Sequence, residues 1–117
     1  MLNVPGTVRI FVCLVPTDMR KSIDGLAGLA HTVLQQDPLS GHLFVFVGRR
    51  RDRVKLLYWD GDGYALWYKR LEQGTFRLPA AEGDQTSVTL SSAELTMLLC
   101  GLDLASVRRA KRYRRPA

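Results

Sequence analysis

The sequence predicts an α+β domain with a mostly antiparallel sheet, built on a central three-stranded meander and accompanied by two helices. The main observation is that three apolar, aromatic-rich runs lie between Gly41 and Gly74, separated by the turn sequences GRRRDR and DGDG. Segments on either side of this stretch carry apolar residues at helical spacing, and a short β-type run comes before each of them. The expected element order is therefore strand, helix, three strands, strand, helix.

The first two elements are predicted from apolar periodicity. A strand is expected from Val8 to Val15, with both faces largely apolar, and Pro16 is expected to end it. An amphipathic helix is expected from about residue 18 to 36, with Thr17 or Asp18 as its N-cap. The Asp-Pro pair that follows should stop this helix.

The faces of the meander follow from the pairing of its strands. Because DG is a strong hairpin signal, Val47 is paired with Val54 and Trp59 with Tyr64 across the two turns. One face of the sheet is then a plain core face. The other is aromatic with interleaved cations, and a face this apolar is not left open to water. Three candidates could cover it: the C-terminal helix, a second copy of the chain in a homodimer, or nucleic-acid bases stacked on the rings.

The C-terminal part is predicted to add a short strand from Ser87 to Leu90 and then a second helix. Ser91 and Glu94 match the SxxE capping box that starts a helix, and leucines follow at helical spacing. By length the chain forms one domain. We place this domain at residues 1–107 and a basic C-terminal tail at residues 108–117.

The composition is typical of a soluble globular protein, with 46% hydrophobic and 24% charged residues. No apolar run approaches the roughly 20 residues that a membrane-spanning helix needs. The N-terminal segment lacks the basic region of a signal peptide, so we expect a cytoplasmic protein that does not contact a membrane. Cys13 and Cys100 lie in apolar runs without metal-ligand spacing, which favours buried, reduced thiols.

The net charge of +6 is concentrated at the C-terminus. Six of the 17 basic residues are in the tail, and the remaining 11 are balanced by 11 acidic residues. A cationic extension on a neutral body is common in proteins that contact nucleic acid, because each neutralised phosphate releases counterions. The alternatives are a solubilising tail or contact with an acidic protein surface. The cations of the tail are Arg108, Arg109, Lys111, Arg112, Arg114 and Arg115.

A second basic cluster lies at the first hairpin of the meander. Charges at a hairpin tip can simply be solvated and protect a sheet from edge pairing. Four arginines within five residues exceed this need. Because the planar guanidinium suits phosphates and guanine edges, we expect this loop to contact nucleic acid, and the charge alone does not choose between DNA and RNA. Its candidate contacts are Arg49, Arg50, Arg51, Arg53 and Lys55.

Motifs for catalysis or metal binding are lacking. Asp60 and Asp62 resemble the start of a calcium loop, but the third ligand and the closing glutamate are absent, and a hairpin turn explains the sequence better. His31 and His42 have no ligand spacing around them. We therefore expect no catalytic residue, no metal and no cofactor. A metal-dependent nuclease is the one enzymatic alternative, because basic loops beside carboxylates are compatible with it.

Two long strings carry a family resemblance. TDMRKSIDGLAGLA (Thr17–Ala30) and GHLFVFVGRRRDRVKLLYWDGDGYALWYKRLEQGTFRLP (Gly41–Pro79) closely resemble the TnpB accessory protein, the second open reading frame, of bacterial insertion sequences of the IS-sixty-six class. The similarity extends from about Val8 to Leu104. It departs at Ser22, Ile23 and Leu78, where the family often has Gly, Phe and Trp. The resemblance implies participation in DNA transposition beside a separate transposase that carries the catalytic acids, and it implies no catalytic residues in this chain.

The leading hypothesis is a non-catalytic accessory protein of DNA transposition that binds DNA through the basic hairpin loop, assisted by the tail. The competing hypothesis is a protein-interaction module that docks on the transposase through the aromatic sheet face. A metal-dependent nuclease is the remote alternative. The candidate residues for the contact with the transposase are Phe44, Phe46, Trp59 and Tyr68.

Overall fold

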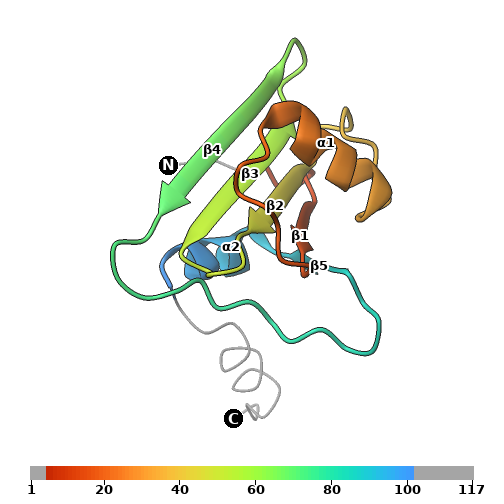
Figure 1. Ribbon diagram of the computed structural model, residues 1–117. Coiled ribbons are helices and arrows are strands. Elements are labelled where there is room, and N and C mark those ends of the chain that lie inside the picture. Colours follow the sequence, from red (N-terminus) through yellow and green to blue (C-terminus); the bar gives the residue numbers. More distant parts are fainter. Residues whose placement is uncertain (1–4, 102–117) are drawn as a thin grey trace.

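The protein consists of a five-stranded sheet with one helix on each side (Figure 1). The structure is a computed structural model that describes residues 5–101. The strands lie in the order β4-β3-β2-β1-β5. The elements, in chain order, are β1 (Ile10–Cys13), α1 (Ile23–Thr32), β2 (Leu43–Val47), β3 (Arg53–Trp59), β4 (Tyr64–Arg70), β5 (Ser87–Leu90) and α2 (Ser92–Leu99).

The topology confirms the predicted α+β class. Strand β1 pairs with β2 in parallel, and the other three pairs of strands are antiparallel. The predicted meander is formed by β2, β3 and β4, and its register is the expected one: Val47 lies opposite Val54, and Trp59 lies opposite Tyr64. The parallel pair arises because α1 carries the chain from the end of β1 back to the end of the sheet where β1 began, so that β2 runs in the same direction.

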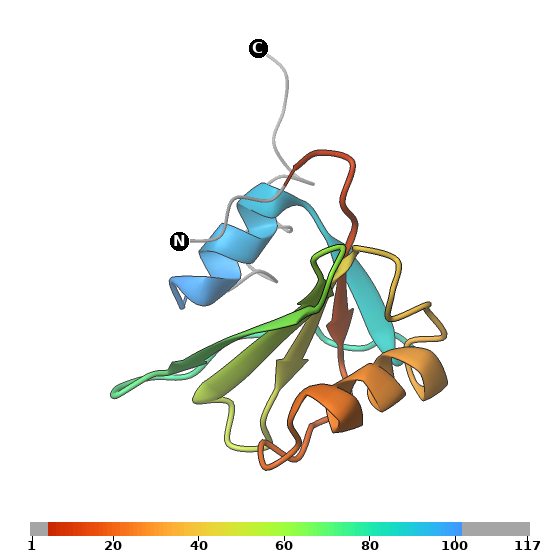
Figure 2. The ribbon, with the colours of Figure 1, turned by 90° about the horizontal axis from the view of Figure 1, so that it is seen from above.

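The two helices cover opposite faces of the sheet (Figure 2). The aliphatic face, with Val45 and Leu56, packs against Leu98 of α2. The aromatic face, with Phe44 and Phe46, packs against α1. The C-terminal helix is therefore not what covers Phe44 and Phe46, because the crossover helix between the parallel strands packs on this side.

Helix α1 begins four to five residues later than the sequence predicts. Ser22 is its N-cap, and residues 18–21 form a turn in which the main-chain N–H of Lys21 donates to the carbonyl oxygen of Asp18 (3.1 Å). The Asp18 carboxylate accepts from the N–H of Arg20 (2.9 Å). A carboxylate that bonds two residues ahead stabilises a turn instead of a helix. The helix also ends early, at Thr32.

Helix α2 confirms the predicted capping box. The N–H of Glu94 donates to the Ser91 hydroxyl (3.1 Å), and the N–H of Ser91 donates to the Glu94 carboxylate (3.0 Å). At the other end of the helix, Lys69 Nζ donates to the carbonyl oxygen of Leu99 (3.1 Å). A cation at a helix C-terminus satisfies a free carbonyl and complements the helix dipole, so α2 is tied to β4.

Phe76 anchors the long connection from β4 to β5 and was not anticipated from the sequence. Its side chain is fully buried on the α2 side of the sheet, and its N–H donates to the carbonyl oxygen of Arg51 (2.6 Å). Of the two thiols, Cys13 is buried, whereas Cys100 is exposed, which corrects the expectation for the latter. Within residues 5–101, no helix has the length and apolar character needed to cross a membrane.

Candidate nucleic-acid interface

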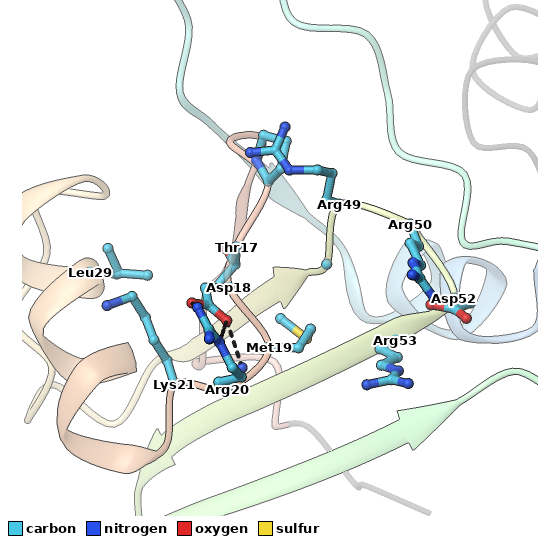
Figure 3. A pocket seen from close by; sticks show the side chains of 12 residues that line it. Thr17, Asp18, Met19, Arg20, Lys21, Leu29, Arg49, Arg50, Asp52 and Arg53 are labelled. Atoms are coloured by element: carbon cyan, nitrogen blue, oxygen red, sulfur yellow. Dashed lines mark hydrogen bonds and ion pairs between the residues drawn. The ribbon is translucent and has the colours of Figure 1, made fainter.

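An open hollow of about 780 Å³ lies between the loop before α1 and the turn that joins β2 to β3 (Figure 3). Its lining is rich in basic side chains from both loops. The residues around it are Pro16, Thr17, Asp18, Met19, Arg20, Lys21, Leu29, Gly48, Arg49, Arg50, Asp52 and Arg53.

The two loops are joined at the base of the hollow. The N–H of Thr17 donates to the carbonyl oxygen of Val47 (3.0 Å), and Thr17 forms a parallel β-bridge with Gly48. Met19 lies between the loops, so close to Gly48 that a Cβ atom at this glycine would be 2.7 Å from Met19 Cγ. The absence of a side chain at residue 48 therefore allows the loops to pack together.

Lys55 connects β3 to the loop before α1. Its Nζ donates to the carbonyl oxygens of Met19 and Lys21, both at 2.8 Å, and lies 5.5 Å from the centroid of the Tyr68 ring. An ammonium engaged in this way stabilises the loop. Lys55, predicted as a DNA contact, thus has a structural role in this loop, and it does not line the hollow.

The arginine turn has a defined backbone. The N–H of Arg51 donates to the carbonyl oxygen of Gly48 (2.9 Å), and the N–H of Gly48 donates to the carbonyl oxygen of Arg53 (3.1 Å). Arg51 adopts a left-handed conformation with φ of 63°. All three side chains are exposed; Arg49 and Arg50 line the hollow, whereas Arg51 does not.

Arg53 differs from the arginines at the tip because it is half-buried. Its Nε is withdrawn from solvent and has no hydrogen-bond partner among the described residues. A buried stem restricts the rotamers of the side chain. Less conformational entropy is then lost when the guanidinium binds an anion.

One ion pair lies within the hollow. Arg20 Nη2 is 2.8 Å from Asp18 Oδ2, and Arg20 Nε also donates to Asp18 Oδ1 (3.1 Å). This hydrogen bonding lowers the pKa of the Asp18 carboxyl to about 2, so the carboxylate remains charged at neutral pH. The lining holds five cationic and two acidic side chains, and the net excess of positive charge favours anions.

The structure thus unites three of the predicted DNA contacts, Arg49, Arg50 and Arg53, in one hollow. It adds Arg20 and Lys21, which were not predicted as contacts because the helix predicted from residue 18 included them. The adjacent basic residues in TDMRK were the sequence signal that could have identified these two contacts. The predicted contacts of the tail lie outside the described residues: Arg108, Arg109, Lys111, Arg112, Arg114 and Arg115.

The predicted aromatic contact surface is largely absent. Phe44 and Phe46 are 0% exposed beneath α1, so neither ring can reach a partner in the folded protein. Trp59 is partly buried and packs edge-on against Tyr64, with ring centroids 5.1 Å apart. Tyr68 alone of the four candidates has a large exposed surface, at 48%.

Comparison with known proteins decides the family. The model of a protein family described as IS66 Orf2 like protein matches residues 8–109, which is most of the chain. The chain belongs to this family. The IS66 Orf2-like family supports an accessory role in transposition, and the resemblance noted in the sequence is thereby confirmed.

Two curated relatives are similar to this IS66 Orf2-like protein over most of their length. Both come from Sinorhizobium fredii and are named uncharacterized proteins y4jC and y4hO. The first is 38% identical over 99% of this chain and 97% of its own length, and the second is 41% identical over 88% of each. No solved structure matches the chain.

Membership of the IS66 Orf2-like family suggests a non-catalytic protein. Asp60 and Asp62 lie in the exposed turn between β3 and β4, where the N–H of Asp60 donates to the carbonyl oxygen of Gly63 (2.8 Å). His42 accepts at Nδ1 from the N–H of Arg9 (3.0 Å). Within residues 5–101, no three His, Cys, Asp or Glu side chains are grouped so that they could hold a metal ion.

Proposed function

We propose that this protein is a non-catalytic accessory factor of transposition that binds DNA through the basic hollow between the loop before α1 and the β2–β3 turn. The observation that carries the proposal is the meeting of five cationic side chains from two loops around one hollow. These are Arg20, Lys21, Arg49, Arg50 and Arg53.

The chemistry of the lining matches a DNA backbone. Phosphate contacts supply much of the affinity of proteins for DNA, and guanidinium groups bind phosphate oxygens with two parallel hydrogen bonds. Arg49 and Arg50 are exposed, so they can reach a large ligand. The hollow is open, which suits a polymer that continues beyond the site.

The loops are also fixed before any ligand arrives. The Thr17 hydrogen bond to β2, the Met19 contact with Gly48 and the two hydrogen bonds of Lys55 hold the walls together. Preorganisation of a binding site reduces the entropy that is lost on binding. In this proposal Arg51 and the tail add charge near the DNA, and the hollow supplies the main contacts.

The proposal is tested by single charge reversals. Arg49→Glu and Arg50→Glu are each compared with Arg9→Glu, which changes the charge by the same amount on an exposed residue beside a different hollow. The probe is duplex DNA from the end of the insertion sequence, and the readout is fluorescence anisotropy. We expect each turn variant to weaken binding by about tenfold or more, or about 1.4 kcal/mol, with Arg9→Glu much closer to the wild type. Equal effects of all three would refute the assignment to the hollow.

Docking on the transposase through an aromatic sheet face has less support. Two of its four candidate residues, Phe44 and Phe46, are covered by α1. A buried ring contributes to a contact only if the covering helix moves away. The basic hollow needs no such rearrangement.

A further inference from the structure

Tyr68 lies beside the hollow, on the same face of the sheet. In the register of β3 and β4, Lys55 is opposite Tyr68 and Arg53 is opposite Arg70. Residues opposite one another, and residues two apart along a strand, share a face. The four side chains therefore form a compact cluster, and Arg53 belongs both to this cluster and to the hollow.

The Tyr68 ring lies against a fixed cation and is half exposed. Lys55 Nζ lies 5.5 Å from the ring centroid, and two main-chain carbonyl oxygens fix the position of that ammonium. Even so, 48% of the Tyr68 surface is exposed, and it is the one aromatic residue among the exposed large hydrophobics of residues 5–101. A half-exposed ring leaves aromatic surface on which a base can stack.

The position of the ring at the edge of the sheet gives a ligand access. Strand β4 is the end strand, and within the described part of the chain no strand pairs with its outer side. Two residues after Tyr68 is Arg70, which forms an exposed ion pair with Glu72 (3.0 Å). Exposed ion pairs are weak, so Arg70 can exchange the carboxylate for a phosphate.

We propose that Tyr68 stacks on an unpaired base of single-stranded DNA whose backbone runs past Arg70 and Arg53 into the basic hollow. This inference rests on the proposed DNA binding by the hollow and specifies the form of DNA that the whole surface recognises. A ring on a sheet surface, flanked by cations, is the arrangement used to bind single strands without strong sequence preference. The bases of a duplex are stacked on each other inside the helix, and only an unpaired base can lie on the ring.

The consequence is a preference for DNA that carries unpaired nucleotides. Phosphates in the hollow are available in both duplex and single-stranded DNA, whereas the stacking contact is made by the single strand alone. Removal of the ring should therefore weaken binding to single-stranded DNA and leave binding to the duplex unchanged.

The test compares a single-stranded oligonucleotide with the duplex of the same sequence, using anisotropy of a terminal label. The variants are Tyr68→Leu, which removes the ring, and Tyr68→Phe, which keeps it. Leu39→Ala is the control, because Leu39 has a similar exposure, at 52%, but belongs to the loop after α1. Thermal unfolding of each variant establishes that it is folded.

We expect Tyr68→Leu to weaken single-strand binding by about fivefold or more and to leave duplex binding within about twofold of the wild type. Tyr68→Phe and Leu39→Ala should both remain within about twofold for either form of DNA. If a folded Tyr68→Leu variant binds single strands like the wild type, or weakens both forms equally, stacking is refuted while DNA binding by the hollow stands. If Tyr68→Leu no longer co-purifies with the transposase but binds single strands with unchanged affinity, stacking is refuted as well. If the wild type binds neither form of DNA, the proposed function itself fails.

Discussion

Lys55 in strand β3 donates a hydrogen bond from Nζ to the main-chain carbonyl oxygen of Met19, 36 residues earlier in the chain, at 2.8 Å. A second hydrogen bond of the same length goes to the carbonyl oxygen of Lys21. These carbonyls belong to the loop that forms one wall of the basic hollow, and β3 begins at the other wall. The ammonium therefore fixes the distance between the two sets of cations that we propose to bind DNA.

Replacing Lys55 with methionine keeps most of the side-chain length but removes both hydrogen bonds. Lys55→Met should lower the free energy of unfolding by about 1–2 kcal/mol, because two carbonyl oxygens lose a charged donor. Urea denaturation followed by circular dichroism measures this change. Lys21→Met is the matched control, and its effect should stay within about 0.5 kcal/mol, the range for surface substitutions. Similar stabilities of the two variants would argue against the role assigned to Lys55.

The contact between Met19 and Gly48 is tested by a double-mutant cycle. A Cβ at residue 48 would meet Met19 Cγ at 2.7 Å, so Gly48→Ala should destabilise the protein by about 1–3 kcal/mol through overpacking. Combined with Met19→Ala, which removes the obstructing atoms, the same substitution should cost clearly less. Additive effects of the two substitutions would show that the side chain of Met19 is not what limits residue 48.

Asp18 is expected to oppose DNA binding because its carboxylate occupies Arg20 and adds negative charge to the hollow. Asp18→Asn should strengthen duplex binding by about threefold to tenfold, in the range expected for one charge near a phosphate. Asp37→Asn is the matched control: Asp37 also accepts the N–H two residues ahead, that of Leu39 (2.9 Å), but it lies outside the hollow. An equal gain for both variants would point to net charge alone.

The pH dependence of this effect follows from the lowered pKa of Asp18. The carboxylate has a folded-state pKa of about 2, so the ion pair with Arg20 is fully formed above the ordinary pKa of an aspartate and is lost only as pH falls through about 2. The ratio of affinities between Asp18→Asn and the wild type should therefore be constant from pH 5 to pH 8. A ratio that changes within this range would contradict the assigned ion pair.

The capping box offers a stability change that is separate from the hollow. Ser91→Ala removes the acceptor for the N–H of Glu94 and should lower stability by about 1 kcal/mol. Ser92→Ala, at the next position, keeps the box and should change stability little. The DNA affinity of both folded variants should equal that of the wild type, since α2 covers the face of the sheet opposite to α1. Altered DNA binding by Ser91→Ala would connect α2 to the interface.

Local sequence signals predicted much of the fold. The DG turn and the aligned apolar residues set the register of the meander, and the SxxE pattern placed the start of α2, because each of these depends on residues close in sequence. The arginine turn was also recognised, and three of its four arginines line the hollow. Short-range chemistry was sufficient for these elements.

The features that were missed depend on contacts distant in sequence. The apolar spacing of Met19 and Ile23 extended the predicted helix to residue 18, whereas Lys55 and Asp18 hold residues 18–21 as a loop. Arg20 and Lys21 were therefore not seen as part of the site. In the same way, the crossover from β1 to β2 brings α1 over Phe44 and Phe46, and no pattern within the meander contains that information.

The salt dependence of duplex binding tests the central claim most directly. Because each phosphate contact contributes about 0.9 to the slope of log K against log salt concentration, neutralising three contacting arginines should reduce the slope by about 2–3. The variant combines Arg49→Gln, Arg50→Gln and Arg53→Gln, and binding to the duplex is measured over a salt series beside the wild type. A slope reduced by this amount is the result we predict. An unchanged slope, with both proteins folded, would contradict DNA binding through the hollow.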